Sequence, residues 1–85
     1  MKATIFKRRI MHYTITKNLI DEIGNLDVKV PEKQTQRFRL LDDDDEVYFE
    51  GYQTPDRDEF APLDEVGAGY GCTALQYWNK GWQWL

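Results

Sequence analysis

Five consecutive carboxylates, Asp42-Asp43-Asp44-Asp45-Glu46, are the residues of this 85-residue chain whose types and spacing most suggest chemistry. A helix-loop-helix calcium loop requires acids at alternate positions, a glycine at the sixth position and a glutamate at the twelfth. Counted from Asp42, the sixth residue is Val47 and the twelfth is Gln53, so this pattern fails. The side chains of adjacent residues also diverge, which leaves at most a weak, non-specific site for Ca²⁺ or Mg²⁺.

The residues around the acidic run predict a hairpin. Polar and apolar residues alternate on both sides of it, so that Phe38 and Leu40 share one face of a strand and Val47 and Phe49 share one face of the next. The carboxylates then form the loop between two antiparallel strands. Two interpretations remain open: a solvated tip that discourages aggregation through strand edges, or an acidic surface that recognises a partner with a basic surface.

A second cluster of interest is aromatic and lies near the end of the chain. Asn79-Lys80-Gly81 is typical of a short hairpin turn, and it separates Tyr77 and Trp78 from Trp82 and Trp84. Trp82 and Trp84 share a face, whereas Tyr77 and Trp78 point in opposite directions, so at least one ring must face away from the core. The rings are either the core of a small domain or an exposed interface patch. Stacking on nucleic-acid bases is disfavoured by the surrounding acids.

Together the two clusters supply the candidate partner-binding residues, which are Asp42, Asp43, Asp44, Asp45, Glu46, Tyr48, Trp78 and Trp82.

No catalytic residue, metal ligand or cofactor is predicted. Gly67-Ala-Gly-Tyr-Gly71 lacks the glycine that a dinucleotide-binding loop needs at its sixth position, which is Cys72, and we expect a turn or a flexible lid there. Cys72 and His12 lack the supporting residues of a nucleophile–base pair, and zinc requires three or four ligands.

The charge of the chain is divided between its two halves. Residues 1–39 carry nine basic and four acidic residues, whereas residues 40–85 carry two and eleven, and the net charge is −4. The halves either pair with each other or meet a charged partner. Lys7-Arg8-Arg9 is the one compact basic run, and it either contacts nucleic acid or protects a strand edge.

The single cysteine and the lack of long apolar runs bear on the compartment. Cys72 has no second cysteine for a disulfide, which fits a reducing cytoplasm. No apolar run approaches the roughly 20 residues that span a bilayer, and the residues after Arg9 are too polar for a signal peptide. We therefore expect a complete, intracellular chain.

The remaining pattern predicts short elements. Residues 3–7 and 10–16 are extended; Leu19–Ile23 forms a helix that Asn18 caps and Gly24 ends; residues 26–30 form a strand; Gly51 marks a bulge or a close approach; and Pro62–Val66 makes one helical turn.

The fold class that follows is α+β, with a small antiparallel sheet of four or five strands, two hairpins, and one or two short helices. Residues 1–85 are expected to form a single domain, with a basic part over 1–35 and an acidic two-hairpin part over 36–85.

Residues 37–85 carry a distinctive motif set, namely Arg37-Phe-Arg-Leu-Leu-Asp-Asp-Asp44, Glu46-Val-Tyr-Phe-Glu-Gly51, Phe60-Ala-Pro-Leu-Asp64, Gly71-Cys-Thr73 and a closing Gln76-Tyr77 before the Trp-rich end. This set resembles a type of small open reading frame found in bacterial chromosomes, plasmids and phages, which has no assigned activity. The resemblance implies a shared fold and no catalytic residue. It also implies a glycine where this chain has Asp45, so a looser turn is expected here.

These observations predict a non-enzymatic, acidic protein-interaction module, such as an accessory or inhibitor protein of a phage or mobile element. One alternative is a nucleic-acid-binding protein that uses Lys7–Arg9 and exposed aromatic rings. A second alternative is a small metal-binding protein or enzyme.

Overall fold

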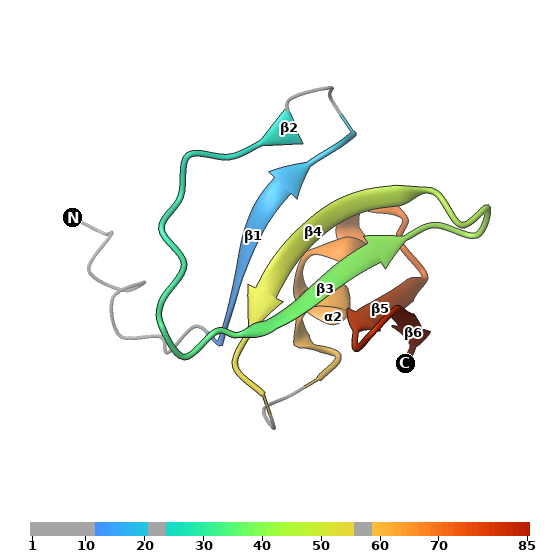
Figure 1. The fold of residues 1–85 in the computed structure, drawn as a ribbon. Coiled ribbons are helices and arrows are strands. Elements are labelled where there is room, and N and C mark those ends of the chain that lie inside the picture. Colours follow the sequence, from blue (N-terminus) through green and yellow to red (C-terminus); the bar gives the residue numbers. More distant parts are fainter. Residues whose placement is uncertain (1–11, 21–23, 56–58) are drawn as a thin grey trace.

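The computed structural model describes residues 12–20, 24–55 and 59–85. These residues form one six-stranded antiparallel sheet with a short helix and a 3₁₀ turn (Figure 1). The elements are β1 (Tyr13–Asn18), β2 (Gly24–Asn25), β3 (Gln36–Leu41), β4 (Val47–Gln53), α2 (Ala61–Glu65), η1 (Gly67–Tyr70), β5 (Ala74–Trp78) and β6 (Trp82–Trp84). The predicted fold class is confirmed, although the sheet has six strands instead of four or five. The predicted strand over 3–7 and the basic run Lys7–Arg9 lie outside the described residues.

The strand order is β2-β1-β4-β3-β5-β6, and every neighbouring pair is antiparallel. Both β4 and β5 pair with β3, so they run in the same direction on either side of it. The chain between them must therefore cross one face of the sheet, and this crossing segment contains α2 and η1. Figure 1 shows α2 behind β3 and β4. No helix in the described part of the chain is long and apolar enough to cross a membrane.

The hydrophobic core lies between the sheet and this crossing segment. Phe38 and Leu40 of β3 are 0% exposed, as their predicted shared face requires. Burial of each of these two side chains contributes roughly 1.5–3 kcal/mol to the free energy of unfolding. The remaining buried members of the core are Tyr13, Phe49, Ala61, Cys72 and Leu75. No tryptophan belongs to it, so the interpretation of the three Trp rings as core is wrong.

Both predicted hairpins are confirmed, with one change of register in the first. Leu40 lies opposite Phe49, but Leu41 lies opposite Val47, so Tyr48 is the extra residue of a bulge. Because of this bulge, Tyr48 packs against the core beside Phe49, and Val47 is not among the side chains that do so. Phe49 lies opposite Leu40 and Val47 lies opposite the next residue, Leu41, so the prediction that Val47 and Phe49 share one face is wrong.

The predictions for residues 18–30 need correction. Asn18 ends β1, and its side-chain oxygen accepts a hydrogen bond from the N–H of Ile20 at 3.1 Å, which makes a turn. Leu19 and Ile20 are not helical, and 21–23 lie outside the described residues. Gly24 has a φ of 75° and begins the two-residue strand β2, and residues 26–30 are not a strand. A helix of five residues is marginal by itself, and the chain pairs β2 with the end of β1.

The other two short elements also have defined structure. The predicted helical turn over Pro62–Val66 is confirmed as α2, with proline at its second position. The glycine-rich segment, expected to be a turn or a flexible lid, is the 3₁₀ turn η1, and Gly71 follows it with a φ of 90°. The N–H of Cys72 donates to the carbonyl oxygen of Gly67 at 2.9 Å, which closes this turn.

Gly51 leaves no room for a side chain, which agrees with the predicted close approach. A Cβ atom added there would lie 2.2 Å from the carbonyl oxygen of Thr14 and 2.8 Å from Cζ of Phe38. The neighbouring strand and the core ring can approach β4 only because this position has no side chain.

The substitution Gly51→Ala is expected to lower the free energy of unfolding by about 3 kcal/mol, because overpacking against a backbone oxygen cannot be relieved by a rotamer change. Urea unfolding followed by tryptophan fluorescence measures the change. Gly69→Ala is the matched control, since a Cβ atom there meets nothing within 4 Å, and it should change stability by less than about 0.5 kcal/mol. Equal stabilities for the two variants would contradict the account of Gly51.

Candidate functional site

The acidic run forms a tight, hydrogen-bonded loop between β3 and β4. The N–H of Asp45 donates to the carbonyl oxygen of Asp42 at 3.1 Å, and the N–H of Asp42 donates to the carbonyl oxygen of Glu46 at 3.0 Å. The carboxylate oxygen Oδ1 of Asp42 also accepts from the N–H groups of Asp44 at 2.8 Å and Glu46 at 3.0 Å. The first carboxylate of the run therefore stabilises the loop by hydrogen bonds to its backbone.

Asp45 takes the backbone conformation that a glycine would normally take. Its φ is 63°, in the left-handed region. Short hairpin loops place a glycine at this position because it has no Cβ atom to clash, and aspartate is one of the few other residues that tolerate it. The expectation of a looser turn in the absence of glycine is therefore wrong, since Asp45 adopts the strained conformation and the turn stays tight.

The loop is also attached to its surroundings. The Thr73 hydroxyl donates to Oδ1 of Asp43 at 2.7 Å, which ties the loop to the segment before β5. The N–H of Glu46 and other hydrogen bonds lower the pKa of Asp42, and a hydrogen bond to the Asp42 carboxylate raises the pKa of the Tyr48 hydroxyl. Asp42 and Asp43 thus stabilise the fold, whereas Asp44, Asp45 and Glu46 are exposed without a side-chain bond to the rest of the described chain.

The other predicted residues, Trp78 and Trp82, lie on the face of the sheet opposite α2. Their rings meet edge to face with centroids 5.4 Å apart, and Trp78 is 45% exposed. Two guanidinium groups lie over these rings. Cζ of Arg37 is 5.9 Å from the Trp78 centroid and 5.0 Å from that of Trp82, and Cζ of Arg39 is 4.2 Å from that of Trp82. All three distances are within the range of cation–π attraction. We call Arg37, Arg39, Trp78, Trp82 and Trp84 the open-face cluster.

Polar contacts from neighbouring strands hold the two arginines. Arg37 forms an ion pair with Glu50 of β4 at 3.0 Å. The Nε–H of Arg39 donates to the side-chain oxygen of Gln76 of β5 at 2.6 Å. Burial lowers the pKa of Arg39, and repulsion by Arg37 acts in the same direction, whereas Glu50 raises it. The cluster is therefore an ordered, positively charged surface on an acidic protein.

The structure does not bring the eight predicted residues into one site. Leu41, at the acidic end of β3, lies opposite Ala74, whereas the side chain of Gln36 at the other end donates to the carbonyl oxygen of Trp78 at 2.9 Å. The acidic loop with Tyr48 and the pair Trp78–Trp82 thus lie at opposite ends of β3. At about 3.3 Å per residue, the strand separates them by about 16 Å or more.

Arg37 and Arg39 were not among the predicted site residues, yet both stack on the tryptophans. The alternation Arg37-Phe38-Arg39-Leu40 predicts the face on which both arginines lie, because a strand that buries Phe38 and Leu40 must point both arginines the other way. The sequence does not predict their contact with Trp82, since this contact depends on β5 and β6 following β3 in the sheet.

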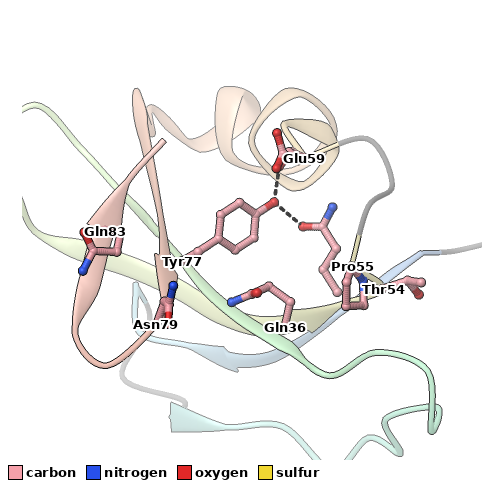
Figure 2. Close-up of a pocket in the computed structure, with 8 residues that line it drawn as sticks. Gln36, Thr54, Pro55, Glu59, Tyr77, Asn79 and Gln83 are labelled. Carbon is pink, nitrogen blue, oxygen red and sulfur yellow. Dashed lines mark hydrogen bonds between the residues drawn. The ribbon is translucent and has the colours of Figure 1, made fainter.

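A hollow of about 210 Å³ lies among the described residues on the α2 side of the sheet (Figure 2). It is lined by Gln36, Gln53, Thr54, Pro55, Glu59, Tyr77, Asn79 and Gln83. The Tyr77 hydroxyl lies 2.6 Å from the side-chain oxygen of Gln53 and 2.5 Å from the carbonyl oxygen of Glu59. These contacts join the sheet to the segment before α2, so Tyr77 and Gln53 have a structural role.

The described residues contain no cluster of metal ligands, and the thiol of Cys72 is buried. In the described ranges, no three His, Cys, Asp or Glu side chains are placed to hold a metal ion together. Cys72 is buried in the core, and burial raises the pKa of its thiol to about 11. A thiolate nucleophile needs the opposite shift.

Comparison with known proteins yields no relative from which a role can be transferred. No family model, no curated protein and no solved structure matches the chain.

Replacement of Asp45 tests the strain in the acidic loop. Asp45→Gly is expected to raise the free energy of unfolding by about 0.5–1 kcal/mol, and Asp45→Ala is expected to lower it by a similar amount, because only glycine adopts a positive φ freely. Urea unfolding measures both changes. Asp44→Gly removes the same charge at a position without a positive φ, so a gain of equal size there would assign the effect to charge instead.

Cys72 should react slowly with a disulfide reagent in the folded protein. At pH 8, a pKa of about 11 in place of 9.0 lowers the thiolate fraction about a hundredfold, and burial slows the reaction further. Reaction in urea is the control. Because the folded state keeps the thiol proton more tightly, stability should also fall as the pH rises from 9 towards 11. Equal rates in the folded and unfolded protein would contradict this burial.

Proposed function

We propose that this chain is a non-enzymatic protein-interaction module that binds its partner through the open-face cluster. The observation that carries the proposal is the stacking of Arg37 and Arg39 on Trp82, on the sheet face opposite α2. Tryptophan and arginine are the residue types most enriched among those that dominate binding energy at protein interfaces.

The exposure and order of the cluster support this role. Trp78 is 45% exposed and Trp84 is 58% exposed, although large aromatic side chains are normally highly buried in a monomeric domain. The guanidinium groups and the edge-to-face contact hold two of the three rings in place. A partner therefore meets a surface that loses little conformational entropy on binding.

The acidic loop takes a secondary part in this proposal. Asp44, Asp45 and Glu46 form a charged tip at the far end of β3, where they speed or orient the approach of a partner that carries basic residues. The proposal includes an accessory or inhibitor role in a phage or mobile element, because the open reading frames that residues 37–85 resemble are found there; the resemblance itself carries no activity.

A second candidate function is binding of single-stranded nucleic acid on the same face. The observation that favours it is the excess of basic groups there, with Lys17, Arg37 and Arg39 against the single carboxylate of Glu50 in the cross-strand rows. Rings and arginines on an open sheet are typical stacking platforms for bases. The net charge of −4 opposes the approach of a polyphosphate, so this function ranks second.

Affinity capture with the purified chain as bait tests the proposal. Trp78→Ala is expected to weaken capture of the bound protein by about tenfold or more, because loss of a central interface tryptophan costs about 2 kcal/mol. Phe60→Ala is the matched control, since Phe60 is a similarly exposed ring, 43% against 45%, at the start of α2. Circular dichroism confirms that both variants fold.

Three other outcomes would contradict this assignment. Capture that survives Trp78→Ala but is lost when Asp44, Asp45 and Glu46 become Asn, Asn and Gln would place the binding surface at the acidic loop. Capture that is unchanged by either set would exclude both surfaces. Binding of oligothymidylate at low salt, with an affinity that falls steeply as salt is added, would establish the second candidate.

A further inference from the structure

The chemistry of the open-face cluster defines which group of a partner it can hold, and the argument rests on the proposed function. Arg39 lies 4.2 Å above the Trp82 ring, and Arg37 lies 5.0 Å from the same ring. A guanidinium group is planar, and stacking on an indole fixes the direction of its N–H groups. Both cations are therefore oriented before any partner arrives.

Among the described residues, the two cations have one counterion within ion-pair distance, and it pairs with Arg37. Glu50 pairs with Arg37 at 3.0 Å, whereas Arg39 has only the neutral oxygen of Gln76, at 2.6 Å, as its hydrogen-bond acceptor. Loss of hydration lowers the pKa of Arg39 most; Glu50 opposes this shift, and repulsion by Arg37 adds to it. A second carboxylate placed here would be attracted to an incompletely neutralised, partly desolvated pair of guanidinium groups.

The Nη1 and Nη2 groups of Arg39 are the donors that can bind that carboxylate. Its Nε–H is used by Gln76, and within the described residues no oxygen accepts a hydrogen bond from Nη1 or Nη2. Two parallel N–H groups match the two oxygens of a carboxylate, and such bidentate bonds are among the strongest hydrogen bonds in proteins.

The surroundings of this edge add an apolar requirement. Trp78 and Trp84 present exposed ring surface on the same face of β5 and β6 as Trp82. Covering these rings needs apolar side chains on both sides of the carboxylate. A segment that is acidic throughout would leave them in water and would also be repelled by the net charge of −4.

We propose that the open face binds a protein segment in which one Asp or Glu carboxylate, held by Arg39 and Arg37 above Trp82, is flanked by apolar side chains that cover Trp78 and Trp84. The segment that contacts the open face is therefore acidic and apolar, whereas the basic residues that the acidic loop attracts lie elsewhere on the same partner. One uncompensated charge suits a single carboxylate, whereas a nucleic-acid backbone requires several basic contacts for comparable affinity.

Selection from a random-peptide display library on the purified full chain tests this inference. Enriched peptides should carry one Asp or Glu between aromatic or aliphatic residues. In calorimetric titration, replacing that acid by its amide should weaken binding by at least about tenfold, the usual size of a charge-assisted hydrogen bond. Arg39→Gln should weaken it similarly, and Arg39→Lys should not restore it, because lysine lacks the bidentate edge.

Lys17→Gln is the matched control, because it removes a positive charge from the same face, two strands from β3, without touching the rings. If Lys17→Gln weakened binding as much as Arg39→Gln, the effect would come from the overall charge of the face, and the inference would be overturned. Enriched peptides that lack an acid, or that bind Arg39→Gln unchanged, would also overturn it while leaving the proposed function in place.

Two results would overturn the inference and the proposed function together. One is a failure of any peptide to bind the chain more tightly than the Trp78→Ala, Trp82→Ala double variant. The other is oligothymidylate binding this face more tightly than the best peptide, since the occupant would then be nucleic acid.

Discussion

The Phe38 ring lies against the backbone of Gly51, and the arrangement of the sheet depends on this contact. Only a residue without Cβ lets β4 accept the ring of Phe38 from one side strand and the carbonyl oxygen of Thr14 from the other. With that approach established, β1, β4 and β3 lie side by side, and Leu40 lies opposite Phe49 two residues further along the register. The crossing segment with α2 then covers the resulting apolar face.

The same strand that supplies the core also supplies the surface. The alternation of β3 directs Phe38 and Leu40 inward, so it must direct Arg37 and Arg39 outward. Because β5 and β6 follow β3 in the sheet, Trp78 and Trp82 come to lie beside these arginines. The core and the candidate binding surface are therefore two consequences of one strand, and a register slip of one residue would destroy both.

The first two carboxylates of the acidic run stabilise the fold. Asp42 accepts hydrogen bonds from backbone N–H groups within its own loop, and Asp43 accepts one from Thr73. An acidic protein thus carries its ordered aromatic surface in its most basic cross-strand rows, at the other end of β3 from the acidic loop. Net charge alone would have suggested the opposite kind of partner for this surface.

The sequence by itself determined the two hairpins, the inward face of β3, the close approach at Gly51 and the helical turn after Phe60, because each follows from alternation or from the conformational limits of glycine and proline. It did not determine the bulge at Tyr48, the left-handed Asp45 or the turn after Asn18, where hydrogen bonds within and between strands override weak local preferences. The meeting of Arg39 with Trp82 was decided only by the tertiary structure. Those residues are far apart along the chain, and only the order of strands in the sheet places one above the other.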